Sequence, residues 1–168
     1  MVTGSIVSSL QGEPRATHDI DIVVQIHESS IPALLSAFKS PRFYLSANSI
    51  KEAIEYQSMF NLLDTTEGDK IDFWILTQEP FDASRFQRKI KEHALGMVMQ
   101  VSSPEDTILA KLRWANISGG SEKHLTDALR VYEVQYGGLD LTYLETWATK
   151  LELEDYWHDL KRKAQPLE

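Results

Sequence analysis

The sequence predicts an α+β fold, in which a small mixed β-sheet with flanking helices is followed by a C-terminal segment that is helical throughout. Short apolar runs at residues 20–26, 59–63 and 70–76 are typical of β-strands. Beyond the Ser- and Gly-rich turn at residues 118–121, apolar residues recur at helical spacing and no strand pattern returns. We therefore expect a core at residues 1–117 and a helical segment at residues 118–168 that packs on it.

The composition is that of a folded, globular chain. A domain of 168 residues buries roughly 70% of its unfolded-chain surface, so it needs no covalent staples. The absence of cysteine excludes disulfides and thiolate metal sites, and fits a cytoplasmic location. No apolar run approaches the roughly 20 residues that span a bilayer, and no secretion signal is visible. The net charge of −8 disfavours a protein that coats nucleic acid generally.

The first residues of the chain predict an anion-binding turn. Val2 and Thr3 end a strand, Gly4-Ser5 form a turn, and a short helix follows at residues 6–10. A glycine allows a tight turn, and a helix N-terminus offers free backbone N–H groups to a phosphate. Arg15 lies in the loop that follows, where it either approaches a triphosphate or is an exposed loop arginine.

Two carboxylates, Asp19 and Asp21, begin the apolar run that ends at Ile26. Because a strand alternates its faces, both acids point the same way, while the alternating isoleucine and valine side chains point to the other face. Paired oxygen ligands on one face suit hard divalent cations. A third acid, Asp72, is embedded in the apolar run at residues 70–76, where it must be paired, hydrated or metal-bound.

At these residues the sequence resembles the DNA polymerase β superfamily of nucleotidyltransferases, and among them the small bacterial enzymes that include the AbiEii-type toxins. Residues 103–112 and Asp127 extend the resemblance over most of the chain. It implies transfer of an NMP from an NTP to an acceptor, with release of pyrophosphate and with Mg²⁺ or Mn²⁺ as cofactor. The acceptor is RNA, a protein side chain or a small molecule; the toxin-like relatives suggest tRNA or a partner protein, and a role in toxin–antitoxin systems or phage defence.

The resemblance also implies roles for individual residues. Asp19, Asp21 and Asp72 would hold metal and act in catalysis, with Asp72 taking the acceptor proton. Gly4, Ser5 and Lys111 would bind the nucleotide. Arg15 and Asp127 are further candidates, although Lys111 and Asp127 also fit the solvated face of an amphipathic helix, and the residues around Asp127, including His124, depart from the family pattern.

The remaining elements follow from periodicity, caps and turn residues. We expect a hairpin of the strands at 59–63 and 70–76, with Asp64 serving the turn between them. The aromatic residues Trp147, Tyr156 and Trp157 are expected to pack between helices. Further helices are predicted at residues 31–38, 49–56, 104–115, 122–135, 141–151 and 154–163, a short helix or loop at 81–86, and strands at 85–92 and 96–101.

A basic stretch suggests where an acceptor would bind. On a strand at 85–92, Arg85, Lys89 and Lys91 would share one face and Arg88 the other. Such a positive edge on an acidic protein favours a phosphate-bearing acceptor such as RNA, while the alternative is an ordinary solvated edge. The basic residues at 161–163 are explained by the C-terminus of a helix, which favours cations.

Two further functions compete with an active transferase. One is a nucleotide-binding or partner-binding module that keeps the fold without turnover. The other is a glycosyltransferase, which also uses a metal-bound Asp-x-Asp pair but usually needs a larger domain. The abrupt start of the first strand indicates a shortened or misplaced start, a degenerate family member, or a strand that is simply brief. A missing lead-in helix would leave an apolar face for a homodimer or another chain, such as an antitoxin.

Overall fold

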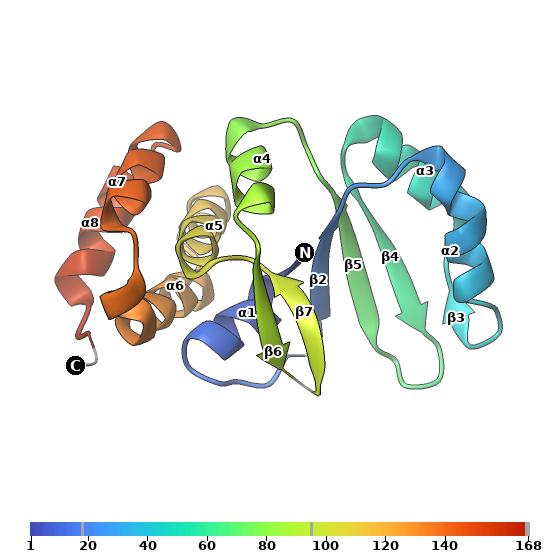
Figure 1. The fold of residues 1–168 in the computed structure, drawn as a ribbon, viewed down its shortest axis with the longest axis horizontal. Helices are drawn as coiled ribbons and strands as arrows, with labels where there is room; N and C mark the ends of the chain where they lie inside the picture. Colours follow the sequence, from blue (N-terminus) through green and yellow to red (C-terminus); the bar gives the residue numbers. More distant parts are fainter. Residues whose placement is uncertain (18, 95, 167–168) are drawn as a thin grey trace.

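A seven-stranded mixed sheet forms the centre of the protein (Figure 1). The computed structural model describes residues 1–17, 19–94 and 96–166. The strand order is β3-β4-β5-β2-β1-β7-β6, and the predicted α+β class is confirmed. The strands are β1 (Val2–Thr3), β2 (Asp19–Val24), β3 (Phe43–Tyr44), β4 (Met59–Asp64), β5 (Lys70–Ile75), β6 (Ile90–Ala94) and β7 (Met97–Val101).

Most of the predicted helices are confirmed. Ser46 caps α3 by accepting a hydrogen bond from the Ser49 amide, and Ser103 caps α5 by accepting one from the Asp106 amide. The helices are α1 (Gly4–Gln11), α2 (Ile31–Ala37), α3 (Ala47–Tyr56), α4 (Pro80–Gln87), α5 (Pro104–Ile117), α6 (Glu122–Gln135), α7 (Leu141–Lys150) and α8 (Glu154–Lys163). Short 3₁₀ turns lie at residues 28–30 and 136–138.

The predicted strand at residues 85–92 is wrong over its first half. Residues 85–87 belong to α4, and β6 begins only at Ile90. Pro80 opens α4 in its first turn, and Arg85 reaches back one turn to Asp82, with 3.0 Å between Nε and Oδ1. Arg85, Lys89 and Lys91 therefore do not share a strand face.

The register of the sheet places the predicted acids side by side. Strand β2 pairs in parallel with β5, with Asp21 opposite Asp72, and antiparallel with β1, with Asp21 opposite Thr3. Strands β4 and β5 form the expected antiparallel hairpin. At its turn the Asp64 carboxylate accepts hydrogen bonds from the amides of Thr66 and Glu67, as predicted for that residue.

The sheet face opposite the acids carries the first hydrophobic core. Phe60 and Ile75 of the hairpin are buried there with Ile50 and Ala53 of α3. In Figure 1, α2 and α3 lie beside β4 and β5 on this side of the molecule. The alternation of polar and apolar positions along β2 and β5 therefore directs the apolar side chains to these helices and leaves the acids on the other face.

The second core joins α5 to the C-terminal helices. Leu112 of α5, Leu144 of α7 and Trp157 of α8 are buried in one cluster, and Phe81 of α4 belongs to it too. Trp147 and Tyr156 pack against this cluster, which confirms the packing role predicted for them. Side chains from both sides of the predicted boundary at residue 118 thus share one core, and the division into segments stays a prediction. Among the described residues, no helix is long and apolar enough to cross a membrane.

Candidate active site

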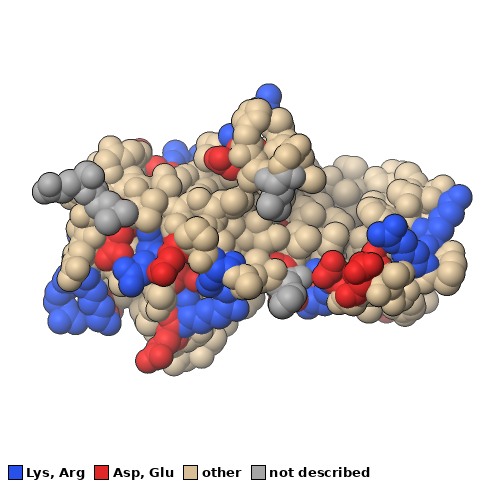
Figure 2. Space-filling view, turned by 90° about the horizontal axis from the view of Figure 1, so that it is seen from below, with Lys and Arg blue, Asp and Glu red and all other residues tan. Residues whose placement is uncertain are grey.

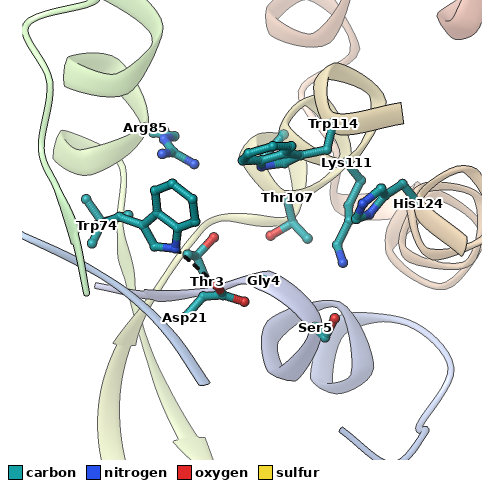
Figure 3. A pocket seen from close by; sticks show the side chains of 12 residues that line it. Thr3, Gly4, Ser5, Asp21, Trp74, Arg85, Thr107, Lys111, Trp114 and His124 are labelled. Carbon is teal, nitrogen blue, oxygen red and sulfur yellow. Dashed lines mark hydrogen bonds between the residues drawn. The ribbon is translucent and has the colours of Figure 1, made fainter. Parts of the chain in front are cut away.

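A cavity of about 270 Å³ lies between the acid-bearing sheet face and helices α4, α5 and α6 (Figure 3). The turn from β1 into α1 forms its floor, and two tryptophan side chains lie over the opposite part. The lining residues are Thr3, Gly4, Ser5, Asp21, Val23, Trp74, Arg85, Thr107, Ala110, Lys111, Trp114 and His124.

The turn at Gly4 brings a helix N-terminus against Asp21. Gly4 has φ +71°, a left-handed conformation that side chains disfavour, and a Cβ there would lie 2.0 Å from Asp21 Oδ2. Thr3 is the N-cap of α1 and makes no side-chain cap hydrogen bond. The first amides of α1 lie at the floor of the cavity without that cap, where a helix N-terminus favours an anion.

The Asp21 carboxylate is held from the other side by Trp74. The indole Nε1–H donates to Asp21 Oδ1 over 3.1 Å. Burial raises the pKa of Asp21, the Trp74 hydrogen bond opposes this rise, and the nearby negative charges of Asp72 and Asp19 add to it. A cation bound beside these carboxylates would offset both the cost of burying the Asp21 charge and its repulsion from Asp72 and Asp19.

Asp72 lies next to Asp21 and has polar partners of its own. Its exposed fraction is 8%, and its Oδ2 lies 2.9 Å from Lys70 Nζ. Asn61 of β4 donates a hydrogen bond to Asp72 Oδ1. Neither partner was predicted from the sequence. Lys70 could have been found, because it precedes Asp72 by two residues and so shares its strand face, whereas Asn61 meets Asp72 only through the hairpin register.

The structure brings Asp21 and Asp72 together and leaves Asp19 at the exposed start of β2, where it pairs in register with Lys70. Within residues 1–17, 19–94 and 96–166, no three His, Cys, Asp or Glu side chains are grouped closely enough to hold a metal ion. Magnesium in nucleotide enzymes usually takes one or two carboxylates, with substrate phosphates and water completing its shell. Asp21 and Asp72 fit that donor set, and the role of Asp19 stays a prediction.

An ionic network centred on the buried Lys111–Asp127 pair joins four predicted residues from separate parts of the chain. Lys111 is 4% exposed, and its Nζ donates to Asp127 Oδ2 over 2.6 Å. Arg15 binds the same carboxylate through Nε at 3.0 Å and Nη2 at 2.9 Å. Arg15 Nη2 also donates to Ser5 Oγ over 3.0 Å, which connects the network to the first turn of α1. Lys111 and Asp127 are therefore not the solvated helix residues of the alternative interpretation.

The three charged groups of this network stabilise one another. Burial lowers the pKa of Lys111, and the hydrogen bond to Asp127 opposes that change. Burial also acts to raise the pKa of Asp127, but hydrogen bonds from Arg15 and Lys111 outweigh it and hold the pKa below its usual value. Asp127 is thus ionised near neutral pH and fixes the two cations beside Ser5.

The cavity is also lined by four side chains that were not predicted to bind the nucleotide: Trp74, Trp114, Arg85 and His124. Trp74 follows Asp72 by two residues, and Trp114 follows Lys111 by three, so each shares the face of a predicted site residue. Arg85 was concealed by the wrongly predicted strand. The fourth is His124, the pKa of which is lowered by burial.

No protein-family model matches this sequence, and no curated protein matches it either.

Proposed function

We propose that the protein is a metal-dependent nucleotidyltransferase that moves an NMP unit from an NTP to an acceptor. The observation that carries the proposal is the pairing of Asp21 with Asp72 across β2 and β5, with the Gly4 backbone packed against Asp21. This arrangement puts two carboxylates beside a helix N-terminus, within reach of a ligand that brings both phosphates and a divalent cation.

The residues of the cavity suit the binding of a triphosphate. Backbone amides at the start of α1 and the Ser5 hydroxyl would hold phosphate oxygens, and Lys111 would supply positive charge from α5. Asp127 and Arg15 would act on the substrate through Lys111 and Ser5, because they fix those two side chains.

The reaction makes one bond and breaks one. The acceptor oxygen would bond to the α-phosphorus as the bond from that phosphorus to the bridging oxygen breaks, which releases pyrophosphate. The Asp72 carboxylate would take the acceptor proton. Mg²⁺ or Mn²⁺ held by Asp21 and Asp72, with Asp19 as a further ligand, would neutralise the charge on the phosphoryl and leaving oxygens. Asp72 would have to exchange its contact with Lys70 for these partners.

The acceptor, the partner and the location belong to the same proposal. The resemblance to toxin-like enzymes favours tRNA or a partner protein as acceptor and an antitoxin as partner. A second copy of the chain is the alternative partner, and the absence of cysteine fits the cytoplasm as location. The basic edge expected to bind RNA loses much of its support, because Arg85 lines the cavity and Arg88 lies 3.2 Å from Glu105 Oε2 and over the Tyr143 ring.

A second candidate is a nucleotide-binding module without turnover. The Lys70–Asp72 ion pair favours it, because an ammonium group already occupies one oxygen of the acid that would take the acceptor proton. In this candidate an NTP would bind at the α1 turn and Lys111 but would not be consumed.

Calorimetric titration with NTPs in Mg²⁺ or Mn²⁺ tests the shared site. We expect Asp21→Asn and Asp72→Asn each to abolish metal-dependent binding, while both variants keep their fold because they remove repelling charges. Asp69→Asn, which alters an exposed acid in the β4–β5 turn, is the matched control and should bind like the unaltered protein. Unchanged metal-dependent binding in both site variants would overturn the proposal.

A further inference from the structure

Two tryptophan side chains line the cavity on the side away from Ser5 (Figure 3). The ring centroids of Trp74 and Trp114 are 5.8 Å apart, and their planes meet at 62°. Trp114 is 45% exposed although it is one of the largest apolar side chains of the protein. An exposed indole face on a cavity wall offers a surface for a planar ligand.

An arginine lies beside this aromatic pair. Arg85 comes from α4, and its Nε lies 3.0 Å from Asp82 Oδ1. Asp82 is itself fixed by Thr77, which donates a hydrogen bond of 2.6 Å to Oδ2. Figure 3 shows the Arg85 guanidinium directed toward the space next to Trp74 and Trp114. Its terminal nitrogens therefore meet a ligand in that space as hydrogen-bond donors held in place.

The positions of the two tryptophan side chains and of the first turn of α1 match the base and the phosphates of a nucleotide. Lys111 and Trp114 are three residues apart on α5 and line the same cavity, with the Lys111 ammonium directed toward Ser5. The Trp74 indole touches Asp21 at its N–H and presents its ring to the cavity. A ligand with phosphates at Ser5 would therefore extend its other end over the indole rings.

We propose that Trp114, together with Trp74, stacks the base of a bound nucleotide and that Arg85 donates hydrogen bonds to acceptor atoms on the edge of that base. The ligand class is a planar aromatic ring with hydrogen-bond acceptors that is linked to a polyphosphate. This inference rests on the proposed nucleotide site and adds the subsite that distinguishes a nucleotide from a bare polyphosphate. Stacking on a protein aromatic accepts any base, so Arg85 would provide the discrimination between bases.

The test compares ligands with and without a base. Calorimetry with inorganic tripolyphosphate and with each of ATP, GTP, CTP and UTP, all in Mg²⁺, should show at least one NTP binding roughly tenfold more tightly than tripolyphosphate. Trp114→Ala should remove that advantage and leave tripolyphosphate binding unchanged, and Trp114→Phe should keep most of it because a π-face remains. Ile117→Ala is the control, since it shortens an exposed apolar residue of α5 outside the cavity.

Each outcome has a distinct meaning. Equal binding of NTPs and tripolyphosphate by the unaltered protein would overturn the base subsite and leave the phosphate site in place. Failure of every one of these ligands to bind would overturn the proposed function as well. An NTP advantage that survives in Trp114→Ala would remove Trp114 from the subsite. Arg85→Gln should weaken NTP binding alone, and an equal loss of tripolyphosphate binding would show that Arg85 contacts phosphate instead of base.

Discussion

At Gly4 the backbone conformation and the surrounding space make separate demands on the residue. The φ of +71° disfavours any side chain, and the Asp21 carboxylate fills the position of a Cβ. Gly119 has φ +72° with nothing within 4 Å of its Cβ position. A substitution at Gly119 therefore measures the cost of the left-handed conformation alone, without a steric clash.

Alanine substitution separates the two demands. Gly119→Ala should lower the free energy of unfolding by about 1–2 kcal/mol, the cost of a left-handed conformation. Gly4→Ala should lower it further and also weaken Mg–NTP binding, because Asp21 must move. Urea unfolding and calorimetry measure the two effects. Equal losses of stability for the two variants would contradict the close approach of Gly4 to Asp21.

The Lys111–Asp127 pair allows a second test at the scale of residues. Because both groups are buried, Asp127→Asn should lower the free energy of unfolding by about 3 kcal/mol or more, since it leaves Lys111 without its anion. Lys111→Met removes that buried cation, so the double variant should be less destabilised than the sum of the two single variants. Urea unfolding of all four proteins measures the coupling, and simple additivity would contradict a direct pair.

Acidic and basic groups of the candidate site were predicted from the sequence, whereas several of their neighbours were not. Asp21 and Asp72 follow from strand periodicity, while Lys111 and Asp127 came from the family resemblance. Trp74 and Arg85 were missed because their roles depend on the β2–β5 register and on the path of α4. Periodicity gives the face of a residue but not the element that will pack against it.

At the scale of elements, the first turn of α5 joins α4 and α7. Asp106 has no exposed surface. Its carboxylate accepts a hydrogen bond of 2.8 Å from Ser103 Oγ and another of 2.7 Å from the Tyr143 hydroxyl. Arg88 and Glu105 are the charged groups that face it. Burial raises the pKa of Asp106, and the two hydrogen bonds and Arg88 oppose the rise.

This raised pKa predicts a pH effect on stability. The folded protein binds the Asp106 proton more tightly than the unfolded chain, so the contribution of Asp106 favours folding below its unfolded pKa of 3.8 and is lost as pH rises through the folded pKa. Asp106→Asn should therefore stabilise the protein more at pH 7 than at pH 3 relative to the unaltered chain. Urea unfolding at both pH values measures the difference, and a larger relative gain at pH 3 would contradict the assigned direction.

The elements also show where sequence patterns lose information. The strand β3 has only two residues and pairs with β4 through Phe43 and Tyr44, so it leaves no periodic signal. Residues 85–87 were predicted to begin a strand, but the turn-to-turn contact between Asp82 and Arg85 belongs to a helix. Helices with clear caps, such as α5, were predicted within a few residues of their observed ends.

At the scale of the whole molecule, α5 contacts both the sheet and the C-terminal helices. Leu112 of α5 shares a core with α6, α7 and α8, while Trp114 of the same helix contacts Trp74 of the sheet. Figure 2 shows acidic and basic side chains side by side on the face seen from below, so this face is not one continuous basic surface.

The shared helix predicts that the protein unfolds as one unit. Trp74 and Trp114 report on the sheet side, and Trp147 and Trp157 report on the helical core. In each of two variants that keep one pair, urea unfolding followed by tryptophan fluorescence should give the same midpoint as unfolding followed by far-ultraviolet circular dichroism. Midpoints that differ between the two probes within one variant would show that residues 118–168 unfold independently of the core.

Transfer of a labelled nucleotide is the most direct test of the nucleotidyltransferase proposal. The protein would be incubated with Mg²⁺ and each α-phosphate-labelled NTP in a cell extract, and label bound to RNA, protein or small molecules would be separated and counted. We expect label on one acceptor class, lost in Asp21→Asn and Asp72→Asn and retained in Asp69→Asn. Nucleotide that binds at the site but is never transferred, under conditions that support the binding of Mg²⁺ and NTP, would contradict catalysis and leave the binding module as the function.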